Sequence, residues 1–107
     1  MVITEEVQIE SRDYWFKTVE FLQQNWALMD TTAENMIKVF FFNDAAGVFD
    51  ELDYESLDEA TRSLTRNGFE LYSEHVVAQD FLVKPEPPFH RQYHPNGEIY
   101  SSGRHWI

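Results

Sequence analysis

The segment His90–Trp106, HRQYHPNGEIYSSGRHW, holds the residues of this chain that are best suited to chemistry. Three of the four histidines lie in it, beside one glutamate, two tyrosines and two arginines. An imidazole next to a carboxylate can act as a general base or supply metal ligands. The segment therefore indicates either a metal or catalytic centre or the polar face of a β-hairpin.

The turn residues Pro95–Gly97 favour the hairpin. In that register His94 faces Glu98, and His90 lies on the same polar face. In a strand, His90 and His94 stand roughly 13 Å apart, whereas zinc ligands lie at about 2.0–2.1 Å from the ion. We therefore expect no metal and no cofactor. The predicted binding patch consists of His90, His94, Glu98, Tyr100, Arg104 and Trp106.

The chain carries no nucleophile elbow, no glycine-rich phosphate loop and no HExxH sequence. We therefore expect non-covalent binding without catalysis. A small-molecule-binding or hydrolytic protein that uses the hairpin face is an alternative. Trp106 is open to two interpretations, because a terminal tryptophan can anchor a partner or can fold back into the core.

The formal net charge of −11 is the strongest compositional feature. Such a charge repels nucleic-acid phosphates, so we expect no direct binding of nucleic acid. Seven acids and no Lys or Arg lie between Asp44 and Glu59. Spaced carboxylates can imitate phosphates, so an acidic, DNA-mimic-type inhibitor of a nucleic-acid-binding protein is the main alternative function. The acidic patch comprises Asp44, Asp50, Glu51, Asp53, Glu55, Asp58 and Glu59.

The remaining composition is that of one small folded domain of 107 residues, with 16% aromatic residues to fill its interior. It has no cysteine and no long apolar run. We therefore expect a soluble, cytoplasmic protein that does not enter membranes. Residues 1–10 are acidic and are expected to be flexible.

Residues 11–29 are predicted to form the first helix, with Ser11 as its N-cap. Trp15, Trp26 and Met29 fall on one helical face, and Phe16 lies off that face. The predicted helix is therefore apolar around much of its circumference. This suggests burial on two sides or homodimerisation through the helix.

Strong local signals define the middle of the chain. A strand from Met36, a turn at Asp44–Gly47 and a strand over Val48–Tyr54 predict a hairpin. Ser56 and Glu59 form a capping box, and Gly68 suits the end of the helix that follows. Leu57, Ala60 and Leu64 line one face of that helix.

The later elements are less distinct. Phe69–Glu74 resembles a strand, and residues 75–83 fit either a strand or a short helix capped by Ser73. Residues 84–88 form a proline-rich connector to the C-terminal hairpin.

These elements predict an α+β fold, with the order α-β-β-α-β-(α/β)-β-β. We expect an antiparallel sheet of about five strands with two or three helices packed on one face. The expected function is that of a small acidic binding module with a protein partner.

Overall fold

The computed structural model describes residues 6–20 and 23–91 of the chain. The elements are β1 (Glu6–Val7), β2 (Trp15–Glu20), β3 (Gln23–Thr31), β4 (Ile37–Phe42), β5 (Gly47–Tyr54), α1 (Leu57–Arg66), β6 (Glu70–Leu71), the 3₁₀ helix η1 (Tyr72–Glu74), α2 (Val76–Phe81) and β7 (Phe89–Arg91).

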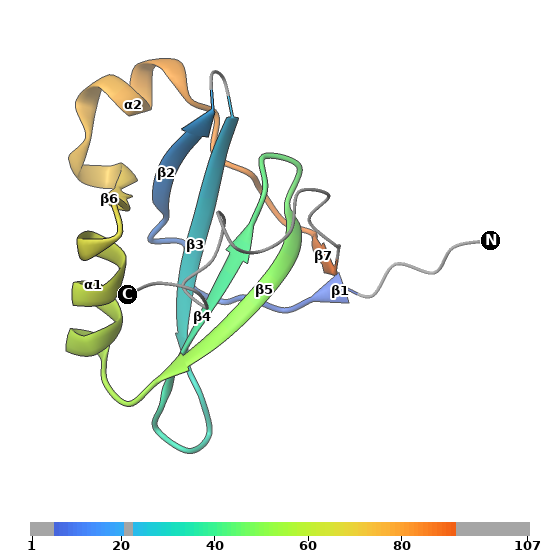
Figure 1. Ribbon diagram of the computed structural model, residues 1–107. Helices are drawn as coiled ribbons and strands as arrows, with labels where there is room; N and C mark the ends of the chain where they lie inside the picture. The colour runs from blue at the N-terminus through green and yellow to red at the C-terminus, as the bar shows by residue number, and fades with distance from the viewer. Residues whose placement is uncertain (1–5, 21–22, 92–107) are drawn as a thin grey trace.

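The described residues form one sheet of seven strands in the order β1-β7-β5-β4-β3-β2-β6 (Figure 1). The pairing of β5 with β7 is parallel, and the other pairings are antiparallel. The α+β class is confirmed, whereas the expected antiparallel sheet of about five strands is wrong in detail. The difference arises because β7 enters beside β5 in the same direction and because two-residue strands lie at both edges of the sheet.

Residues 11–29 do not form the helix that we expected. They form β2 and most of β3, which pair antiparallel with Trp15 opposite Ala27 and Phe16 opposite Trp26. β3 also pairs with β4 over six residue pairs, so it lies inside the sheet. The predicted helical face is therefore wrong.

Burial on both faces of the sheet explains this error. Side chains alternate along a strand, so Trp26 and Leu28 enter one core cluster while Ala27 enters the other. A strand covered on both faces has no polar alternation, and its apolar run resembles that of a buried helix. Trp15, Phe16 and Trp26 fill the core of this chain. These rings therefore do not form the apolar helix surface that suggested homodimerisation.

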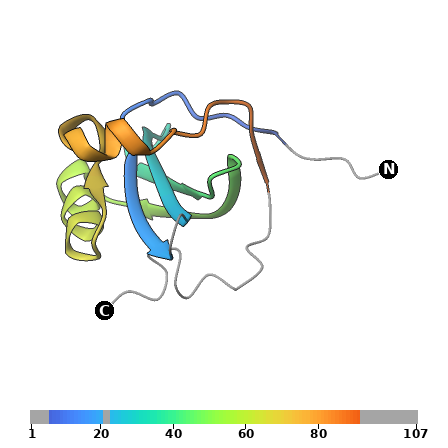
Figure 2. The same ribbon diagram turned by 90° about the horizontal axis from the view of Figure 1, so that it is seen from above.

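The two helices pack against different clusters. Ala60 and Leu64 of α1 join the cluster that contains Phe41, whereas Ala78 of α2 joins the cluster that contains Phe42. Since neighbouring residues of β4 point to opposite faces, α1 and α2 contact opposite faces of the sheet. The expectation of both helices on one face is wrong. Figure 2 shows α1 and α2 at one end of the molecule, with β7 at the other.

The hairpin of β4 and β5 is confirmed. Asn43 stabilises its turn, because the side-chain Oδ1 accepts hydrogen bonds of 2.9 Å from the backbone N–H groups of both Ala45 and Gly47. Ala46 has a positive φ of 64°. The Asn43 side chain therefore stabilises a turn in which Ala46 takes the positive φ that glycine usually adopts.

The second predicted helix is also confirmed. The Ser56 hydroxyl accepts a hydrogen bond from the Glu59 N–H at 3.1 Å. Gly68 ends the helical segment with a φ of 92°. Ala60 and Leu64 are buried as expected, but Leu57 is exposed. The capping residues and the apolar spacing determine this helix locally.

The ambiguity of residues 75–83 is resolved in favour of a helix, α2. Its N-cap is His75, whose Nδ1 accepts a hydrogen bond from the Ala78 N–H at 3.0 Å. Ser73 is not the cap. Residues 82–88 have no helix or strand before β7 begins at Phe89.

At the N-terminus, Val7 and Ile9 are buried, and β1 pairs with β7. The expected flexible segment of residues 1–10 therefore overlaps the sheet from Glu6 onward.

Tyr14 lies in the core with a solvent exposure of 2%. Its ring packs edge-on against Trp26 and Phe42. Its hydroxyl is buried and has no hydrogen-bond partner among the residues that the structure describes. Burial raises the pKa of Tyr14, and the charge of Glu86 raises the pKa further against a lowering effect of Arg12.

Tyr14→Phe is expected to raise the free energy of unfolding by about 1 kcal/mol at neutral pH, because it removes a buried unsatisfied hydroxyl. Above about pH 10 the unfolded chain loses the tyrosine proton while the folded protein keeps it, so the wild type loses stability as the pH rises. The Phe variant should lose less. Urea denaturation of both proteins from about pH 8 to pH 11 measures the difference; parallel curves would contradict it.

Candidate functional site

Of the predicted binding patch, only His90 lies among the described residues. It is half-buried in β7, opposite Glu6 of β1 and Gly47 of β5. Its backbone N–H donates a hydrogen bond of 3.1 Å to the Ala46 carbonyl oxygen. The other predicted patch residues, and the turn between them, lie outside the described residues; these are His94, Glu98, Tyr100, Arg104 and Trp106.

The predicted acidic patch does not form one free surface. Asp50 is buried with an exposure of 6%. Glu51 forms ion pairs with both Lys38 and Arg91. Asp53 also lies 3.9 Å from the Lys38 Nζ.

Two of the other four acids of that patch, Asp58 and Asp44, also make contacts within the chain. Asp58 pairs with Arg62 at 3.0 Å on the surface of α1. The Asp44 carboxylate accepts hydrogen bonds from the Trp26 Nε1–H at 2.8 Å and from the Gln24 N–H at 3.1 Å. Glu55 and Glu59 are exposed. Several carboxylates are therefore engaged within the chain, and this geometry gives phosphate mimicry little support.

The most exposed apolar surface lies on and after α2. Val76, Val77, Phe81 and Val83 have exposures of 73%, 59%, 79% and 89%. Among the described residues, the only other exposed large apolar side chain is Leu57, on α1. Single exposed apolar residues are ordinary, whereas four within eight residues of a short segment are unusual on the surface of a small domain. We call these four residues the α2 ridge.

The fold explains why the α2 ridge is exposed. Ala78 and Leu82 lie four residues apart and contact the core, so they face the sheet. The Tyr72 hydroxyl donates a hydrogen bond of 2.6 Å to the Leu82 carbonyl oxygen, which anchors the end of α2. Val77 and Phe81 are also four residues apart, but on the outer side of the helix. The helix is apolar on both sides although the sheet covers only one.

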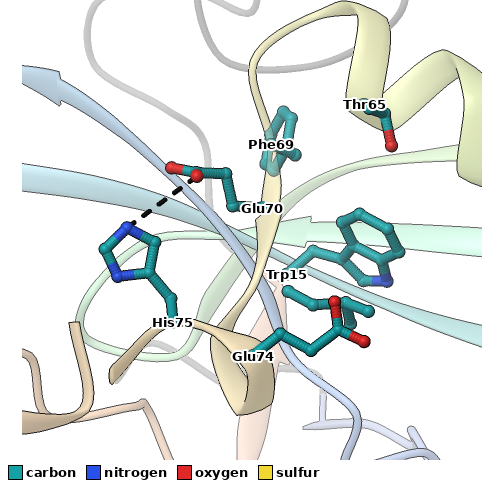
Figure 3. Close-up of a pocket in the computed structure, with 7 residues that line it drawn as sticks. Trp15, Thr65, Phe69, Glu70, Glu74 and His75 are labelled. Atoms are coloured by element: carbon teal, nitrogen blue, oxygen red, sulfur yellow. Dashed lines mark ion pairs between the residues drawn. The ribbon is translucent and has the colours of Figure 1, made fainter. Parts of the chain in front are cut away.

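An open pocket of about 290 Å³ is lined in part by His75, the N-cap residue of α2 (Figure 3). It lies between the end of α1 and the segment of β6, η1 and His75 that leads into α2. Its lining combines three apolar or aromatic side chains with acidic and polar ones: Trp15, Thr65, Phe69, Glu70, Leu71, Glu74 and His75.

The polar side of this pocket is anionic. The Glu70 Oε1 lies 3.8 Å from the His75 Nε2. Because the His75 Nδ1 accepts the hydrogen bond that caps α2, the proton of the neutral ring resides on Nε2 and faces Glu70. Figure 3 shows the Glu74 side chain extending from η1 toward the side of the pocket that Trp15 forms.

Three acids and no Lys or Arg occur between Glu70 and Val83. Glu70, Glu74 and Asp80 are all exposed. The α2 ridge is thus an apolar surface with acidic neighbours.

The sequence interpretation missed this site because it left residues 75–83 without an assignment. Had a helix been assigned, the spacing of Ala78 with Leu82 and of Val77 with Phe81 would have indicated two apolar faces. A six-residue helix on a small domain buries only one of them. The signal was present in the sequence but could be interpreted only after the helix was known.

Comparisons with known proteins give no match. No protein family, no curated protein and no solved structure is significantly similar to this chain.

Two further properties concern the described part of the chain. None of its helices combines the length and apolar character needed to cross a membrane. In residues 6–20 and 23–91, no three His, Asp or Glu side chains come together as a metal-ligand group would.

Proposed function

We propose that this chain is a non-covalent protein-binding domain, and that the α2 ridge is its contact surface. The observation that carries the proposal is the exposure of four large apolar side chains, Val76, Val77, Phe81 and Val83, within eight consecutive residues. Burying a large apolar side chain stabilises a complex by about 1.5–3 kcal/mol relative to leaving it in water. The binding free energy of a protein interface depends mostly on a few such residues, and aromatic residues are prominent among them.

The surroundings of the ridge favour a protein segment over two other occupants. A second copy of the chain would add like charge at the interface, because Glu74 and Asp80 are exposed and each copy carries a net charge of −11. An anionic lipid surface would be repelled by the same residues. A protein segment with apolar side chains can cover the ridge without either penalty.

A selected peptide tests the ridge directly. A library of random dodecamer peptides displayed on phage is panned against the full chain, and enriched peptides are synthesised for titration calorimetry. Phe81→Ser should weaken binding at least tenfold, because it removes the largest exposed apolar side chain of the ridge. Both the wild type and the variant should give the same circular dichroism spectrum, since Phe81 makes little contact with the core.

Leu57→Ser is the matched control, because Leu57 is another exposed large apolar residue but lies on α1. It should change the affinity less than twofold. Equal binding of the peptides to wild type and Phe81→Ser would overturn the proposal, as would a failure to enrich any peptide. Loss of binding in Tyr100→Ala alone would instead assign the contact to the hairpin patch predicted from the sequence.

A further inference from the structure

The pocket and the α2 ridge are neighbours in the chain. His75 lines the pocket and is also the residue directly before Val76, the first residue of the ridge. A partner segment that covers the start of the ridge can therefore reach the pocket. The chemistry of the pocket then limits which side chain of the partner it can receive.

The walls of the pocket are aromatic. Trp15 and Phe69 are almost fully buried, with exposures of 7% and 2%, so each presents a fixed surface. The ring of Phe69 already has a cationic neighbour, since the Lys17 Nζ lies 6.0 Å from its centroid. Aromatic faces attract the charged head of a lysine or arginine side chain, and its apolar stem packs against aromatic rings.

The opening of the pocket is negative. Glu70 and Glu74 both line it and both are exposed, so a ligand can reach their carboxylates without displacing the core. Thr65 belongs to the last turn of α1. The carbonyl end of a helix carries partial negative charge, which also favours a cation. Glu70 and Glu74 therefore attract a positive charge, against the opposing charge of Lys17 beside Phe69.

We infer that the pocket receives a lysine or arginine side chain of the partner, while apolar side chains of the same segment cover the α2 ridge. This inference rests on the proposed function, and it names the partner class as a segment that is both basic and apolar. The acidic residues that disfavour a second copy and a lipid surface are the residues that select this partner.

The geometry also limits the spacing within the partner. His75 and Phe81 are six residues apart, which corresponds to about 9 Å along a helix axis. A partner helix covers a similar distance in six or seven residues, and an extended segment covers it in about three. The selected peptides should therefore place a basic residue at one of these separations from a large apolar residue.

A small probe tests the pocket independently of the ridge. Nα-acetyl-arginine methylamide is titrated into the ¹⁵N-labelled full chain, and amide shifts are followed by NMR. Shifts should concentrate at Thr65, Glu70, Glu74 and His75. The uncharged citrulline analogue, which keeps the shape but not the charge, should produce shifts at least fivefold smaller at the same concentration.

The double variant Glu70→Gln/Glu74→Gln should weaken binding of this probe at least fivefold. Its matched control is Glu34→Gln/Glu55→Gln, which makes the net charge less negative by the same amount at exposed acids outside the pocket. The control should change the affinity less than twofold. Equal effects of the two double variants would overturn the inference, because they would show attraction by the net charge alone. Equal shifts with citrulline would overturn it as well.

The two proposals can fail separately. If Phe81→Ser abolishes peptide binding but the arginine probe does not shift the pocket residues, the cation pocket is rejected and the ridge stands. If the probe binds as expected but Phe81→Ser leaves peptide binding unchanged, the ridge and the joint surface are rejected.

Discussion

Trp26→Ala is expected to lower the free energy of unfolding by about 3–5 kcal/mol, the range for removing a large buried aromatic side chain. Trp26 is fully buried in the sheet, and its ring contacts Tyr14, Phe16 and Tyr72. A domain of this size has a total stability of about 5–15 kcal/mol, so the variant should lose a large share of it and unfold at a much lower urea concentration than the wild type. Circular dichroism during urea denaturation measures the loss.

Trp26→Phe is the control for this prediction. It keeps an aromatic ring in the core but loses the hydrogen bond from the indole Nε1–H to Asp44. We expect a loss of about 1–2 kcal/mol and a folded protein. A Trp26→Ala protein that is as stable as the wild type would contradict the central position of β3. It would also contradict the assignment of residues 11–29 to two strands.

The helix and hairpin in the middle of the chain could be predicted because their signals are local. Ser56 caps α1 through the Glu59 N–H, and Gly68 adopts the positive φ that a residue at the end of a helix requires. The turn from Asn43 to Gly47 carries polar residues between two apolar strands. Capping and turn formation depend on residues a few positions apart, so a single sequence contains the necessary information.

The strands that were missed depend on distant residues. Trp15 and Ala27 look like parts of one helix until β4 and β6 occupy the two sides of the β2–β3 pair. β1 has only two residues, and its position depends on β7, which lies more than eighty residues later in the chain. No periodicity within a short window reports such pairings.

The charges of the predicted acidic patch could be predicted from the sequence, but the ion-pair partners of those charges could not. The acidic character of residues 44–59 is plain in the sequence. Whether a carboxylate such as Glu51 is free or paired with Lys38 depends on the register between β4 and β5. The exposure of Phe81 likewise depends on which side of α2 meets the sheet.

Asp44→Ala is expected to lower the free energy of unfolding by about 2 kcal/mol, although Asp44 lies at the surface in a turn. Its two carboxylate oxygens accept hydrogen bonds from the Trp26 Nε1–H and the Gln24 N–H. Hydrogen bonds to charged groups contribute about 1.5–3 kcal/mol, and loss of the acceptor leaves the donor of a fully buried tryptophan unsatisfied. Urea denaturation measures the change.

Asp44→Asn should lose about half as much, because an amide keeps one oxygen acceptor but replaces the other with a donor. The control is Glu55→Ala, an exposed acid of the same predicted patch, which should change the stability by less than about 0.5 kcal/mol.

Combining Asp44→Ala with Trp26→Phe should give a coupling free energy of about 1 kcal/mol, since both substitutions remove the same hydrogen bond. If Asp44→Ala behaves like Glu55→Ala, then Asp44 is a free surface acid, and phosphate mimicry by residues 44–59 regains its support. If the coupling is found, the Asp44 carboxylate instead links the β4–β5 turn to β3 by hydrogen bonds and stabilises the fold.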